Sequence, residues 1–170
     1  MIKHIVSVLT VIMVGLPLFA GTGSAASKQE TREAKTMYSK GNFQYGEKDY
    51  RKAMMWYSRA SKNDYAPANY KLGMIYSRGL GIPINSRTAA KWYTKSAKQG
   101  YHPAQYELGK MYERGRGVSR DVLEAYMWYQ LAIDSGSKIA KKYLTNLIST
   151  MDKRQIVAAQ KLVQEHREQK

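Results

Sequence analysis

The chain has 170 residues, contains no cysteine and carries a formal net charge of +15 at pH 7. This length suits one domain, and the lack of cysteine excludes disulfides, zinc fingers and thiol chemistry. The excess of positive charge favours acidic partners, whether anionic polymers, nucleic acid or a membrane surface, without choosing among them.

Residues 1–26 have the pattern of a secretory signal peptide, which is removed from the mature protein. Lys3 gives a positive start, residues 5–20 form an apolar run, and residues 24–26 are small, as a cleavage site requires. A retained membrane anchor is the alternative, but the run is short for a span of about 20 residues. We therefore expect an exported protein, periplasmic or secreted, that meets the membrane only through this segment. Without Lys3, 27 Lys and Arg face 13 Asp and Glu, a net charge of +14.

The mature chain is expected to start with a loose tail at residues 27–30 and to continue as a helical repeat domain at 31–165. A stretch in which small residues flank a Trp-Tyr pair begins at Ala53 and recurs at Ala89 and Ala125. This fixed step of 36 residues indicates stacked supersecondary units. The expected parts are units at about residues 31–64, 65–100 and 101–136, a partial unit with a capping helix at 137–165, and a polar tail at 166–170.

Three tryptophans follow the same step, at Trp56, Trp92 and Trp128. Positions three and four apart share one face of a helix, so each indole lies beside the small residues of its stretch. We expect the indoles to be interior wedges between successive helical hairpins; an aromatic ligand cage is the alternative.

The second helix of each unit has a repeated start signal. Asp49, Asn85 and Asp121 are 36 residues apart, and their side-chain oxygens can accept a free backbone amide at a helix start. Asp121 is followed three residues later by Glu124, which is the pattern of a capping box. These residues predict where three helices begin.

The first helices carry glycine in their interiors, at Gly73 and Gly109. Glycine costs about 1 kcal/mol relative to alanine inside a helix, so its repetition suggests close contact with a neighbouring helix. The predicted structural core contains Ala53, Trp56, Ala60, Leu72, Gly73, Tyr76, Ala89, Trp92, Leu108, Gly109, Tyr112, Ala125, Trp128 and Ala132.

The pattern over residues 66–136 resembles the Sel-one-like repeat family, a relative of the tetratricopeptide repeats. The motif Ala-x-Tyr-x-Leu-Gly-x-x-Tyr begins at Ala68 and again at Ala104, and each copy is followed by Gly-x-Gly and a small-x-x-Trp-Tyr stretch. The resemblance implies an all-α, right-handed α-solenoid of stacked antiparallel helix pairs. It also implies a non-catalytic scaffold or adaptor for protein–protein interaction in the bacterial envelope or with host cells, like the short secreted members by which intracellular pathogens enter host cells.

The resemblance further implies that a protein partner binds on a concave surface lined by the first helix of each unit. The candidate partner-binding residues are Tyr38, Tyr70, Met74, Arg78, Tyr106, Lys110 and Arg114. The alternative for each arginine is a solvated surface charge, and each tyrosine could belong to the core instead.

A second candidate surface is a basic stripe on the second helices, formed by Arg59, Lys62, Lys91, Lys95 and Lys98. It is either a solubilising outer face or a docking strip for an acidic partner, such as peptidoglycan or another anionic surface. Nucleic acid is not expected because of the export signal, although binding of phosphate without sequence preference would need a similar pattern.

No catalytic, cofactor or metal site is expected from the sequence. The three histidines, His4, His102 and His166, belong to no cluster with metal-ligand spacing. The glycine-rich turns lack the Gly-Lys-Ser/Thr of a phosphate-binding loop. Glu107 and Glu113 are six apart on one helix and do not share a face as an acid/base pair.

Overall fold

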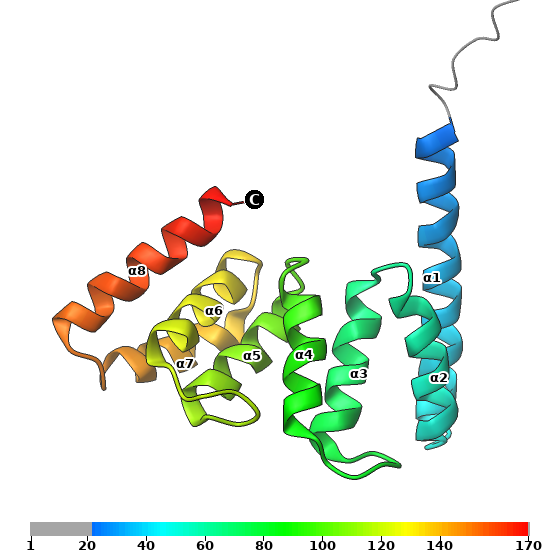
Figure 1. Cartoon of the computed structure of the whole chain (residues 1–170), viewed down its shortest axis with the longest axis horizontal. Coiled ribbons are helices and arrows are strands. Elements are labelled where there is room, and N and C mark those ends of the chain that lie inside the picture. The colour runs from blue at the N-terminus through cyan, green and yellow to red at the C-terminus, as the bar shows by residue number, and fades with distance from the viewer. Residues whose placement is uncertain (1–21, 170) are drawn as a thin grey trace, which may run out of the picture.

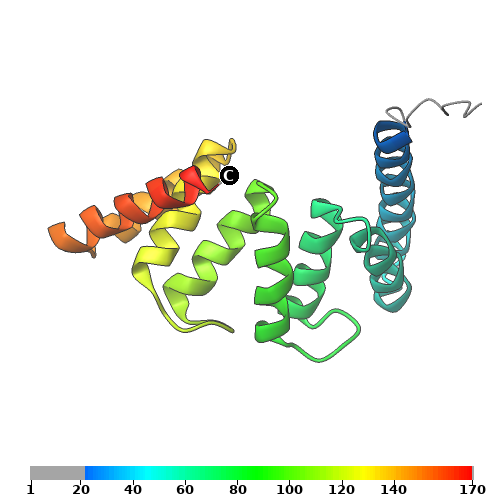
Figure 2. The ribbon, with the colours of Figure 1, turned by 45° about the horizontal axis from the view of Figure 1, so that its top comes forward.

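The computed structural model describes residues 22–169 and folds them into eight α-helices. Consecutive helices pair as α1 with α2, α3 with α4 and α5 with α6, and the pairs stack side by side in a curved row (Figures 1 and 2). This arrangement confirms the predicted all-α solenoid of stacked helix pairs. The helices are α1 (Thr22–Gly46), α2 (Tyr50–Ser61), α3 (Ala66–Arg78), α4 (Ser86–Ala97), α5 (His102–Arg114), α6 (Val122–Asp134), α7 (Lys138–Ile148) and α8 (Lys153–Glu168).

The starts of α2 and α4 are set by side-chain caps, as predicted. Asp49 Oδ1 accepts a hydrogen bond from the backbone N–H of Lys52 at 3.1 Å, and Asn85 Oδ1 accepts one from Thr88 at 2.9 Å. Each bond satisfies an amide that the first turn of a helix leaves without a partner.

The start of α6 forms only half of the predicted capping box. Asp121 Oδ1 accepts from the backbone N–H groups of Leu123 and Glu124, at 2.9 and 3.2 Å. The Glu124 carboxylate does not return to the Asp121 amide, because that amide already donates to the carbonyl of Tyr112 at 3.0 Å. Glu124 instead accepts from Trp128 Nε1 at 2.9 Å.

A glycine and a tyrosine ring join the two helices of each pair. Gly73 of α3 faces Tyr93 of α4 so closely that a Cβ added to the glycine would lie 2.6 Å from a ring carbon. The interior glycine is therefore required, because the ring occupies the space of a side chain. The same contact recurs between Gly41 and Tyr57, and between Gly109 and Tyr129.

The interior wedges are these tyrosines and not the tryptophans before them. Tyr57, Tyr93 and Tyr129 are at most 2% exposed, whereas Trp56 and Trp92 are only half-buried. With 3.6 residues per turn, neighbouring positions on a helix point about 100° apart. When the tyrosine faces the partner helix, the tryptophan lies at the flank, so the predicted interior position is wrong for Trp56 and Trp92, whereas Trp128 is buried, at 4% exposed.

Trp128 is buried because α8 covers it. α8 packs against α6, and the ring of His166 lies 5.5 Å from that of Trp128. Ala159 and Val163 of α8 are also buried. The last helix therefore closes this end of the stack, as predicted, and it does so by covering α6.

The alanines, glycines and leucines of the predicted core are buried, but its two tyrosines are only partly so. Tyr76 and Tyr112 are half-buried and pack against the edge of the larger cluster. The residues that are at most 1% exposed include Ala53, Ala60, Leu72, Ala89, Leu108, Ala125 and Ala132.

Both ends of the described chain are more helical than expected. α1 begins at Thr22, so residues 27–30, which contain no Gly or Pro, are helical and not a loose tail. The predicted signal peptide lies outside the described residues except for its last five. At the other end α8 continues to Glu168, so the predicted polar tail from residue 166 is also wrong. Its side chains find partners, as Arg167 forms an ion pair with Asp134.

None of the helices within residues 22–169 has the length and apolar character needed to cross a bilayer.

Candidate partner-binding surface

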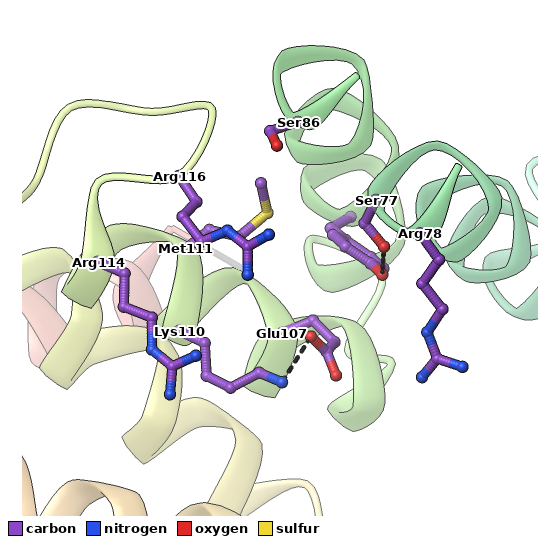
Figure 3. A pocket seen from close by; sticks show the side chains of 9 residues that line it. Ser77, Arg78, Ser86, Glu107, Lys110, Met111, Arg114 and Arg116 are labelled. Carbon is purple, nitrogen blue, oxygen red and sulfur yellow. Dashed lines mark hydrogen bonds and ion pairs between the residues drawn. The ribbon is translucent and has the colours of Figure 1, made fainter. Parts of the chain in front are cut away.

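A pocket of about 280 Å³ opens between α3 and α5 (Figure 3). Its walls carry four positive charges, from Arg78 of α3, Lys110 and Arg114 of α5, and Arg116 of the loop that follows α5. The only acidic residue of the lining is Glu107. We refer to this site as the arginine pocket. It joins three of the seven residues that the sequence predicted to bind a partner.

The repeat places Arg78 and Arg114 at equivalent points of neighbouring units. They are the last residues of α3 and α5, and each helix ends at a glycine with a left-handed backbone, Gly79 (φ 68°) and Gly115 (φ 65°). A cation at the C-terminus of a helix is favoured by the helix dipole. Helix ends and repeat spacing therefore together put two guanidinium groups on one face.

Arg116 is positioned by a tight loop contact. It lies between Gly115 and Gly117, and a Cβ on Gly117 would collide with the backbone of Ser86 at the start of α4. Gly117 also has a positive φ of 77°, which glycine adopts without strain. The loop is thus held against α4, and Arg116 reaches the pocket from there.

The acidic side chains near the pocket already have partners. Glu107 Oε2 lies 2.8 Å from Lys110 Nζ, and Glu113 Oε2 accepts from the Tyr129 hydroxyl at 2.6 Å. Lys110 is held further by the ring of Tyr106, whose centroid is 4.6 Å from Nζ. Within residues 22–169 no ion pair involves the three arginines of the pocket, Arg78, Arg114 and Arg116.

The predicted tyrosines of the first helices lie in clusters of three rings. The ring of Tyr70 is 5.7 Å from that of Tyr93 and 5.5 Å from that of Tyr101, within the range of favourable tilted and edge contacts. Burial raises the pKa of both Tyr70 and Tyr93, so both hydroxyls stay neutral. Tyr70 is half-buried and supports the first-helix face while leaving part of its ring accessible.

The other two predicted tyrosines repeat this arrangement. Tyr38 lies 5.7 Å from Tyr57 and 5.3 Å from Tyr65. Tyr106 lies 6.2 Å from Tyr129 and 5.1 Å from Tyr143. The position 36 residues after Tyr101 holds Ser137 and not a tyrosine. Tyr143 of α7 supplies the third ring instead, so the cluster is kept although the sequence repeat is not.

Met74 departs from its predicted role at the partner surface. It is 6% exposed, because burying a long apolar side chain is favourable. It therefore offers almost no area to a partner.

The basic stripe is not a continuous row of free charges. Lys95 Nζ lies 2.9 Å from Asp64 Oδ1 and donates to the carbonyl of Ser61 at 3.1 Å, so it ties α4 to the end of α2. The guanidinium carbon of Arg59 lies 4.7 Å from the ring centroid of Trp56. Four members of the stripe are exposed and have no ion pair in the described chain: Arg59, Lys62, Lys91 and Lys98.

Arg116 and Glu107 were not predicted from the sequence as residues of this surface, although both line the pocket. Arg116 lies in a turn, where helical periodicity does not predict which way a side chain points. Its position two residues after Arg114, between two glycines, was the only signal. The part of the chain that the structure describes contains no group of three or more His, Asp or Glu placed to hold a metal ion.

The Sel1 repeat model matches three consecutive segments of the chain, residues 34–65, 66–101 and 102–137. A comparison with curated proteins gives no significant match.

Solved structures with the same fold come from several bacteria. A protective antigen present in uropathogenic Escherichia coli strains, which displays an SLR fold, aligns with a TM-score of 0.75 at 25% identity and covers 86% of this chain. The aligned part is only 33% of that antigen. A Sel1 repeat protein from Oxalobacter formigenes gives a TM-score of 0.63 at 26% identity, covering 73% of this chain and 98% of its own. Helicobacter pylori cysteine rich protein B gives 0.58 at 20% identity, covering 71% and 93%.

Proposed function

Because the chain belongs to the Sel1 repeat family, we propose that it is an exported, non-catalytic scaffold that holds a protein partner on the face formed by α3 and α5. Sel1 repeats build a scaffold fold that is typical of protein-interaction modules. The observation that carries the proposal is the arginine pocket, in which three guanidinium groups have no ion pair within the described residues. Its setting would be the bacterial envelope or contact with a host cell.

The α3/α5 face is a better candidate than the basic stripe. Lys95, at the centre of the stripe, is bound to Asp64 and to the carbonyl of Ser61, so docking there would break a contact between two units. The arginines of the pocket have no such contact to lose. Binding by Arg78 and Arg114 would therefore break no ion pair of the described residues.

Site-specific photo-crosslinking in living cells tests which face binds. A photoreactive amino acid replaces Lys110, on the wall of the arginine pocket, or Lys98, on the second-helix face. We expect a defined protein adduct from position 110 and none from position 98. Adducts only from position 98, or equal yields from both, would contradict the proposal.

Export is tested by the N-terminus of the mature protein. Cleavage after Ala26 would remove the first five residues of α1 and leave its packing intact, because the first buried side chain of residues 27–46 is Ala34. Mass spectrometry of protein from the native cells should find Ser27 at the N-terminus. A mature protein that retains residues 1–26 would contradict export by this route.

A further inference from the structure

We propose that the arginine pocket binds an acidic segment of the partner, with Asp or Glu carboxylates seated against Arg78 at one end and against Arg114 and Arg116 at the other. This inference rests on the proposed function and narrows it, since it names the chemistry of the partner.

The charge of the pocket requires an anionic occupant. Four cationic side chains face one acidic side chain, Glu107, which leaves a net charge of +3. Glu107 is already bound to Lys110 at 2.8 Å, so it cannot also neutralise the arginines. A guanidinium group without a partner offers two parallel N–H donors, and a carboxylate fits these donors with both of its oxygens.

The positive charge is local and not a general property of this face. In the first unit, Gly46 takes the place of Arg78 and Arg114 in the repeat, and Asn42 takes the place of Lys110. The site is therefore confined to the junction of the second and third units. Surface charge that served only solubility would not need to be concentrated at one junction between units.

The size of the pocket points to side chains of a larger ligand. Its volume of about 280 Å³ is at the lower limit for pockets that take a whole small molecule, which occupy roughly 300–1,000 Å³. Met111 also lines the pocket, but it is only 7% exposed and offers little area to an occupant.

The arginines are spread along the pocket and do not converge on one point. Figure 3 shows Arg78 on one side of the Glu107–Lys110 ion pair, and Arg114 on the other. A single phosphate would need donors that converge on it. Guanidinium groups on two helices suit separate carboxylates carried by an extended segment.

The test measures binding of a fluorescent octaglutamate peptide to the purified mature chain by anisotropy. The pocket variant is Arg78→Gln with Arg114→Gln, and the control is Lys62→Gln with Lys98→Gln. Both remove two positive charges from exposed side chains that form no ion pair within residues 22–169. Glutamine is about as good a helix former as arginine or lysine.

We expect the Kd for octaglutamate to rise about tenfold or more in the pocket variant, because charge-assisted contacts are lost. The control should change it by less than about twofold, because exposed charges far from the site are screened. A third variant, Arg116→Gln, lies in a loop and should also weaken binding without affecting any helix. Unchanged far-UV circular dichroism would establish that all variants are folded.

Each remaining outcome would overturn the proposal. Equal weakening in the pocket and control variants would mean attraction by net charge alone. Unchanged binding by Arg116→Gln would contradict the proposed seating of a carboxylate against Arg114 and Arg116. Failure of octaglutamate to bind would exclude an acidic segment. The same conclusion would follow if inorganic phosphate or a phosphoserine peptide bound more tightly than octaglutamate. If crosslinks from position 110 persisted in that case, only the acidic chemistry would fail and the scaffold function would stand.

Discussion

Replacing Gly73 with alanine tests how α3 packs against α4. On helix propensity alone, Gly73→Ala should stabilise the protein by about 1 kcal/mol. The structure predicts the opposite, because the added Cβ would lie 2.6, 2.7 and 3.0 Å from three ring carbons of Tyr93. Tyr93 cannot move aside easily, since it is 2% exposed and its hydroxyl shares a hydrogen bond of 3.0 Å with Ser77.

The magnitude follows from these two opposed effects. Overpacking of a filled core costs about 1–3 kcal/mol, and contacts this short place Gly73→Ala at about 3 kcal/mol. Subtracting about 1 kcal/mol of propensity leaves a net loss of about 2 kcal/mol. With a urea m-value of about 2 kcal/mol/M, the unfolding midpoint should fall by about 1 M. Urea denaturation followed by far-UV circular dichroism measures this shift.

Two further variants make the result specific to the contact. Gly46→Ala is the control, because a Cβ at this position meets nothing within 4 Å and should cause no loss of stability. In a Tyr93→Ala background the ring is absent, so Gly73→Ala should no longer be costly, and the double variant should be more stable than additivity predicts. A midpoint raised by Gly73→Ala as much as by Gly46→Ala would refute the proposed packing.

The remaining predictions concern the wedges, the cap of α4 and the half-buried carboxyl of Glu124. Tyr93→Ala should lower the free energy of unfolding in urea by about 3–5 kcal/mol, and Trp92→Ala by only about half as much, because its indole is half-buried; the reverse order would contradict the assignment of the wedges. Asn85→Ala should cost about 1 kcal/mol by loss of the cap on α4, while Asn85→Asp should cost little; equal losses in urea would exclude a role for the side-chain oxygen. Burial raises the pKa of Glu124 above its ordinary value of 4.5, so the native state holds this proton more tightly than the unfolded chain, and native stability falls as the pH rises above that value. The stability of Glu124→Gln relative to wild type should therefore increase from about pH 4 to about pH 7, and a constant difference in urea midpoints would contradict this assignment.

The sequence determined the features that depend on a few neighbouring residues. Asp49 and Asn85 predicted helix starts because a cap bonds to an amide only two or three residues away. The step of 36 residues predicted stacked helix pairs, and it placed Arg78 and Arg114 at equivalent points. These signals are local or periodic, so they can be recognised in the sequence without knowledge of the tertiary structure.

The tertiary structure decided which side chains face inward and which charges remain free. The sequence shows Trp92 beside Tyr93, but only the angle at which α3 approaches α4 selects the tyrosine as the wedge. Likewise, Lys95 and Arg114 are both cations at repeated positions, and only the fold pairs Lys95 with Asp64 while leaving Arg114 without an ion pair in the described chain. Side chains at neighbouring helix positions point about 100° apart. Which of them meets another helix, and which meets an opposite charge, depends on residues that are distant in the sequence.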